Sequence, residues 1–210
     1  SIESMSNTSS PLFAIVDIET NGGGPTGDNI TEVAAILHNG VHEVDRWVQL
    51  IRPARPIPAG ITRLTGIDNS MVQDAREFSG WAEHLHEFLG DAVFVAHNVS
   101  FDLKHLQAGF KAAGMHYNPK RLCTVRMSRK WIKGPQRYSL GALCAFFDIE
   151  NEASHRAWGD ATATAELFAA EGARVHIVDY NEEEGQAAVA KIEAAGGRAC
   201  FYATDVRSEE

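Results

Sequence analysis

Cysteine is scarce in this chain. Three of the 210 residues are cysteine, an odd number at wide spacing: Cys123, Cys144 and Cys200. Such a set builds neither a disulfide framework nor a cysteine-rich zinc site. Reduced thiols are typical of cytoplasmic proteins, so we expect a cytoplasmic location.

Long hydrophobic runs are also missing. No stretch approaches the roughly 20 apolar residues that cross a bilayer, so no membrane partner is expected. Residues 1–10 are polar and lack the basic start and apolar centre of a signal peptide. We expect these ten residues to form a disordered leader.

An excess of basic residues is the third absence, and the net charge is −9. Residues 1–168 carry 15 basic and 19 acidic groups, whereas the remaining 42 residues carry 4 and 9, so the tail holds more than half of the excess. Between Lys120 and Arg137 the balance reverses, with seven basic residues and no acid. This segment is either a surface for phosphate groups or a solvated helix face.

The apolar pattern predicts an α/β domain. Hydrophobic residues make up 44% of the chain, which is ample for one core. Four apolar runs predict strands, at 12–18, 30–38, 41–50 and 92–96, and Asn39-Gly40 between the second and third predicts a hairpin. Five amphipathic or Ala-rich segments predict helices, at 79–89, 101–113, 124–131, 140–147 and 160–171.

Two acids, Asp17 and Glu19, lie at the end of the first predicted strand. Because side chains of a strand alternate between its faces, both carboxylates point to one side. Adjacent acids at the end of a buried strand are costly to desolvate and repel each other, which favours a bound divalent metal. The alternative is that the strand has reached the surface and both acids are solvated.

Two further motifs follow predicted elements in the same way. His97-Asn98 ends the strand at 92–96, and Ser100 is a candidate N-cap that would place Asp102 in the first helical turn. His155 precedes Asp160, which opens the last predicted helix. Taken singly, Asp102 could only complement a helix dipole, and His155 could be an ordinary loop residue. Their joint occurrence favours a single acidic cleft.

The three motifs together resemble a known family. Asp-Ile-Glu-Thr, His-Asn-x-x-Phe-Asp and His-Arg-Ala-x-x-Asp-Ala occur in the order found in the DEDDh (DnaQ-like) 3′–5′ exonucleases, and the likeness is greatest to the epsilon subunits of DNA polymerase III. It covers about residues 11–168 and includes the segments 61–67 and 122–126. One departure is Asn21, where the family often has a second Thr.

The resemblance implies a ribonuclease-H-like mixed sheet flanked by helices and a two-metal mechanism. Two Mg²⁺ or Mn²⁺ ions would be held by four acids: Asp17, Glu19, Asp102 and Asp160. Such ions prefer oxygen ligands. His155 would be the general base, a role suited to a side chain that ordinarily titrates at about 6.5.

The same resemblance implies how substrate is bound. The 3′-terminal nucleotide would contact five residues, of which Leu64 could instead pack in the core: Thr20, Leu64, Thr65, His97 and Asn98. We expect single-stranded or frayed DNA 3′ ends as substrate, with a DNA polymerase as a possible partner. The alternative is a catalytically weak nucleic-acid-binding or polymerase-associated module.

The end of the chain resembles a different family. From about Ala163, the helix, the strand ending at Asp179, the helical pattern at 183–195 and the strand ending at Asp205 resemble a short-chain dehydrogenase fragment. No glycine-rich turn precedes Ala163, and no tyrosine has lysine four residues later. We therefore expect no nicotinamide cofactor. The predicted domains are an exonuclease domain at 11–171 and a C-terminal strand-helix-strand appendage at 172–210.

Overall fold

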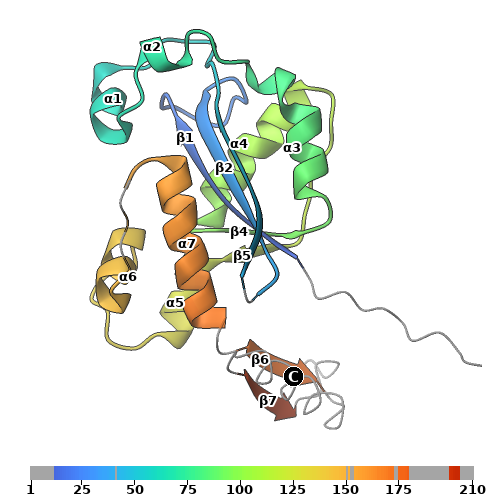
Figure 1. The fold of residues 1–210 in the computed structure, drawn as a ribbon, viewed down its shortest axis with the longest axis vertical. Helices are drawn as coiled ribbons and strands as arrows, with labels where there is room; N and C mark the ends of the chain where they lie inside the picture. The colour runs from blue at the N-terminus through green and yellow to red at the C-terminus, as the bar shows by residue number, and fades with distance from the viewer. Residues whose placement is uncertain are drawn as a thin grey trace, which may run out of the picture.

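The computed structural model describes residues 12–40, 42–149, 151, 154–172, 175–179 and 199–203. These residues form one mixed sheet covered by helices and a second sheet of two strands (Figure 1). The predicted leader and the helical pattern at 183–195 lie outside the described residues. No helix among the described residues is long and apolar enough to cross a membrane.

Five strands build the main sheet in the order β3-β2-β1-β4-β5. Their bounds are β1 Phe13–Thr20, β2 Ile30–His38, β3 Glu43–Leu50, β4 Val93–Ala96 and β5 Arg121–Cys123. The first three pair antiparallel, while β1 with β4 and β4 with β5 pair parallel. The predicted mixed sheet is confirmed.

Helices cover both faces of this sheet (Figure 1). In chain order they are α1 Ala59–Thr65, α2 Asn69–Val72, α3 Ala82–Leu89, α4 Val99–Ala112, α5 Thr124–Trp131, α6 Leu140–Phe147 and α7 Ala157–Gly172. A short 3₁₀ turn, Phe78–Gly80, precedes α3. Leucine and phenylalanine side chains of α3 and α4 fill the larger core on one face. Alanines of α7 pack against the other.

Some predicted boundaries were wrong. Ser100 does not cap α4, because the helix already begins at Val99 and Asn98 is the N-cap, in the left-handed region at φ 73°. Leu64 and Thr65 lie at the end of α1, a helix that is not among those predicted. Gly66 terminates that helix at φ 73°, a conformation that glycine adopts without strain.

The C-terminal strands stand apart from the main sheet. β6 Val175–Asp179 and β7 Ala199–Ala203 pair with each other in parallel. Neither strand extends the five-stranded sheet.

Candidate metal centre

Side chains of strand β1 point alternately into the two cores on either face of the sheet. Ala14, Val16 and Ile18 face the core of α3 and α4, whereas Ile15 packs with the alanines of α7. Asp17 and Glu19 continue the second series and therefore point to the α7 side. The predicted common face of the two acids is what the structure has.

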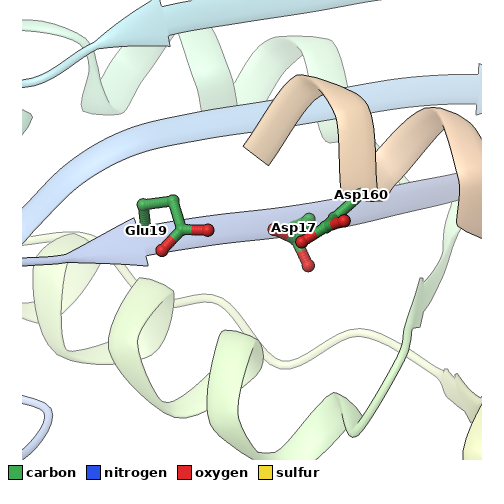
Figure 2. A group of neighbouring side chains, drawn as sticks. All are labelled: Asp17, Glu19 and Asp160. Atoms are coloured by element: carbon green, nitrogen blue, oxygen red, sulfur yellow. The ribbon is translucent and has the colours of Figure 1, made fainter. Parts of the chain in front are cut away.

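Helix α7 brings a third carboxylate to this face. Asp160 lies in its first turn, and ligand oxygens of Asp17, Glu19 and Asp160 all lie within 4.8 Å of one another. Figure 2 shows Asp160 directed from α7 towards Asp17 on β1. All three side chains are partly buried. Acids 143 positions apart in the sequence thus form one cluster.

The fourth predicted acid approaches β1 from the other helix layer. Asp102 lies in the first turn of α4, is 2% exposed, and accepts a hydrogen bond at Oδ1 from the Ile18 backbone N–H at 3.3 Å. It does not belong to the group whose oxygens lie within 4.8 Å of one another. Its charge nevertheless acts on Asp17.

The cluster is electrostatically unfavourable without a cation. Burial, followed by the charges of Asp102 and Asp160, raises the pKa of Asp17 well above its ordinary 3.8. Burial and then Asp160 raise the pKa of Glu19 to about 8, and burial raises that of Asp102 to about 7. A divalent cation would remove this penalty. The donor set consists of carboxylate oxygens, so these residues fit Mg²⁺ or Mn²⁺.

The loop before α7 carries His155. This residue is exposed and adopts φ 65°, which is uncommon for a residue with a side chain. Its backbone N–H donates to Asp160 Oδ2 at 3.1 Å, and the Asn151 amide donates to Asp160 Oδ1 at 2.6 Å. Since a carboxylate has about four acceptor positions, Asp160 retains lone pairs for a metal ion.

Sequence reasoning missed an ion pair next to this loop. The side chain of Glu32 on β2 is 1% exposed. Its Oε1 accepts a hydrogen bond from Arg156 Nη2 at 2.5 Å, and its Oε2 accepts one from Arg156 Nε at 3.1 Å. The Ala157 backbone N–H also donates to Oε2, at 2.7 Å. Position 32 lies in a predicted buried strand, where an acid needs a partner. An acid in this apolar strand was therefore the feature of the sequence that could have indicated an ion pair.

His97 connects elements within the protein. Its Nδ1 lies 2.9 Å from the Thr124 hydroxyl and its Nε2 lies 3.1 Å from the Tyr138 carbonyl. Burial lowers its pKa. Both ring nitrogens thus have protein partners, whereas the neighbouring Asn98 is exposed. Substrate contact by either residue stays a prediction.

The predicted nucleotide-contacting residues of β1 and α1 differ in exposure. Leu64 is 52% exposed, so it does not pack in the core. Thr65 is buried and its hydroxyl donates to the Ile61 carbonyl and accepts from the Ile67 N–H. Thr20 is 9% exposed and accepts from the Gly22 N–H at 3.3 Å. Of the three, Leu64 is the side chain accessible to a ligand.

An exposed aromatic residue beside Asp102 was not predicted as a site residue. Phe101 is 42% exposed at the start of α4, and its ring centroid lies 4.5 Å from that of His105. Its position next to a proposed metal ligand in the sequence makes this exposed phenylalanine a candidate contact for a base or sugar.

Comparison with known families gives two matches. The family described as Exonuclease matches residues 14–168, and short chain dehydrogenase matches residues 157–210. The two ranges overlap in α7. The predicted change of resemblance within this helix is therefore confirmed, although the boundary between two domains stays a prediction.

Individual relatives share the first of these regions. A PolC-type DNA polymerase III of Caldanaerobacter subterraneus subsp. tengcongensis is 34% identical over 180 residues, which is 86% of this chain and 12% of the relative. The 3′-5′ exonuclease DinG of Bacillus subtilis is 35% identical over 158 residues, 74% of this chain and 17% of the relative. The chain thus spans less than a fifth of the length of either relative.

A solved structure agrees with the fold. Exonuclease X, in complex with 5′ overhanging duplex DNA, has a TM-score of 0.61 at 27% identity, covering 75% of this chain and 89% of that one. The order of the acidic motifs along β1, α4 and α7 is that of the DEDDh type. The chain belongs to the exonuclease family that these proteins represent.

Proposed function

We propose that the protein is a metal-dependent 3′–5′ exonuclease that hydrolyses phosphodiester bonds at nucleic-acid 3′ ends. The observation that carries this proposal is the convergence of Asp17, Glu19 and Asp160 within 4.8 Å, next to the loop that holds His155. The unfavourable burial of these acids supports a site that requires cations.

Four carboxylates would hold the ions: Asp17, Glu19, Asp102 and Asp160. Bound by these carboxylates, the ions would supply activation of the attacking water and stabilisation of the leaving oxygen. Asp102 is fixed by the Ile18 N–H, while Asp160 is oriented by Asn151 and by the His155 N–H. Both Mg²⁺ and Mn²⁺ suit these ligands, and we propose that either supports the reaction.

His155 is the proposed general base. Its side chain is exposed while its backbone is hydrogen-bonded to Asp160. We propose that its imidazole accepts a proton from water beside the carboxylate cluster. The proposed base, His155, and the proposed metal ligand Asp160 thus lie five residues apart in one segment of the chain.

We propose that the terminal nucleotide lies against exposed groups of α1 and of the start of α4. Leu64 and Phe101 are exposed apolar side chains that can stack on a base or sugar. Asn98 is an exposed polar group close to Phe101 in the chain. Thr20, Thr65 and His97 are further proposed contacts to the nucleotide, and each also hydrogen-bonds within the protein.

DNA is the proposed substrate. The relatives are named as DNA polymerase III and as a 3′-5′ exonuclease, and Exonuclease X was solved with DNA. Single-stranded or frayed ends, a DNA polymerase as partner and a cytoplasmic location complete this proposal. The basic residues of α5 and the loop after it are exposed, which supports contact with phosphates.

The test uses a single-stranded DNA oligonucleotide labelled at its 5′ end. With Mg²⁺ or Mn²⁺ the protein should shorten it one nucleotide at a time from the 3′ end, releasing nucleoside 5′-monophosphates. An equal oligonucleotide with a blocked 3′ end is the control. Binding without shortening in either metal would instead support the nucleic-acid-binding module.

A further inference from the structure

One buried ion pair joins the metal-binding sheet to the loop of the proposed base. Glu32 lies directly opposite Glu19 in the β1–β2 ladder, so it faces the α7 side of the sheet as Glu19 does. Three ion pairs are found among the described residues, and only that of Glu32 and Arg156 has a buried carboxylate.

The contacts of Glu32 act on the first turn of α7. Its carboxylate accepts hydrogen bonds from Nε and Nη2 of Arg156 and from the Ala157 N–H, which is the first N–H of the helix. The Arg156 carbonyl in turn accepts the Asp160 N–H at 2.9 Å. His155, one residue earlier, donates its N–H to the Asp160 side chain. The proposed base His155, the first residue of α7 and the proposed metal ligand Asp160 are thus linked by hydrogen bonds within residues 155–160 and to Glu32.

We propose that Glu32 is a positioning residue for both His155 and Asp160, acting through Arg156 and the Ala157 N–H. This inference rests on the proposed exonuclease function. Bidentate, charge-assisted hydrogen bonds from an arginine to a carboxylate fix orientation more strictly than neutral hydrogen bonds do. A buried strand residue is a rigid anchor, so it can hold a loop whose own backbone at His155 is in an uncommon conformation.

The hydrogen bonds of the buried Glu32 carboxylate all come from the segment at the start of α7. Burying a carboxylate costs free energy that its partners must offset, so a change at Glu32 should act first on the segment that supplies these partners. Removal of a group that hydrogen-bonds to a metal ligand and orients it typically lowers metal affinity or activity by roughly 10–100-fold.

The experiment compares Glu32→Gln with a matched control, Glu43→Gln. Glu43 also forms a bidentate pair, with Arg46, and Arg46 reaches the Thr162 hydroxyl of α7 at 2.8 Å, further along the helix than the proposed site. We expect Glu32→Gln to lower kcat on a 3′-labelled oligonucleotide by about 10–100-fold, with KM changed less than about twofold. Glu43→Gln should retain the parent kcat.

A second measurement separates positioning from loss of stability. Amide hydrogen exchange of metal-free protein should show the His155 N–H exchanging about tenfold faster in Glu32→Gln than in the parent or in Glu43→Gln. If kcat is unchanged, or if kcat falls while the His155 amide keeps its protection, the proposal is overturned.

A further variant keeps the test decisive if Glu32→Gln does not fold. Arg156→Lys preserves the charge but cannot form the two-pronged contact, so its kcat should fall in the same direction by a smaller factor. A parent-like kcat in Arg156→Lys overturns the proposal. Failure of the parent protein to digest 3′ ends would refute the exonuclease function instead, and the exchange of the His155 amide would still test the positioning.

Discussion

Helices α4 and α7 approach β1 from opposite faces of the sheet, and each carries an acid in its first turn. They hold these acids differently. Asp102 is almost fully buried and bonded to the backbone of β1. Asp160 is partly buried and bonded to Asn151 and to the His155 N–H.

The packing of the two helices differs in the same way. α4 contributes Leu103, Leu106 and Phe110 to the larger core, whereas α7 contributes mainly alanines to the smaller one. The start of α7 depends on the polar contacts of Glu32 instead. Changes on the α4 side should therefore affect stability, while those at the start of α7 can alter activity without unfolding the protein.

The largest effect is expected at Asp17, which lies between the two helices. Asp17→Asn removes a ligand charge without changing side-chain size and should lower kcat by about a thousandfold or more. Repulsion with Asp102 and Asp160 is relieved, so the Tm of the metal-free variant should equal or exceed that of the parent. Initial rates on a labelled oligonucleotide and thermal melting measure both. A parent-like rate would contradict the metal assignment.

The next effect is expected on the α7 side alone. His155→Ala should lower kcat by roughly 10²–10⁴-fold, the usual contribution of a general base, while Mn²⁺ affinity changes little. The exposure of His155 predicts a small change in Tm. Initial-rate assays measure kcat, and Mn²⁺ titration measures the metal affinity. His84→Ala, at another exposed histidine, is the control. If His155→Ala turns over at the parent rate, a different group accepts the proton.

A smaller effect is expected at Phe101, an exposed aromatic residue of α4. Phe101→Ala should raise KM for single-stranded DNA by about tenfold and change kcat less, because stacking on a base is worth about 1–3 kcal/mol. Phe146→Ala, at a phenylalanine of α6 that is 49% exposed, should leave KM unchanged. Equal effects of the two substitutions would show that Phe101 does not contact the substrate.

The carboxylate cluster also predicts how stability depends on pH. The pKa of Glu19 is raised from 4.5 to about 8, so the folded protein binds more protons than the unfolded chain between these values. Stability without metal should therefore fall as pH rises from about 5 to 8, with roughly 2–4 °C of Tm for each kcal/mol lost. Added Mg²⁺ should abolish most of the fall. Melting curves in EDTA and in Mg²⁺ provide the test, and a pH-independent difference between them would contradict it.

Local patterns were sufficient where an element has a strong period. β2, α5 and α6 have the predicted bounds, and the acids of β1 share the predicted face. Helix α1 was missed because it is short and lies between Pro58 and Gly66, residues that are typical of loops.

Long-range contacts were beyond such patterns. Glu32 and Arg156 are 124 positions apart, and nothing around either residue identifies the other. The N-cap of α4 was misplaced because serine and asparagine have similar capping preferences, so propensity could not decide between Ser100 and Asn98. The parallel strand β4 delivers the chain to the helix at Asn98. Propensity describes a residue alone, and the position of the neighbouring strand decided the outcome.

The smallest effect should follow removal of everything after Gly172. The side chains that fix α7 to the sheet, including Ala157, Ala161 and Ala165, precede this point, as do all the proposed metal ligands. β6 and β7 pair with each other and leave the five-stranded sheet unextended. A chain ending at Gly172 should keep the parent kcat, and its Tm should change by no more than about 2–4 °C, the shift that one kcal/mol produces in a protein of this size. A chain ending at Thr164 is the control, since it loses Ala165 and the buried Leu167 and should unfold. Insolubility of the chain ending at Gly172 would mean that the C-terminal segment is integral to the exonuclease fold.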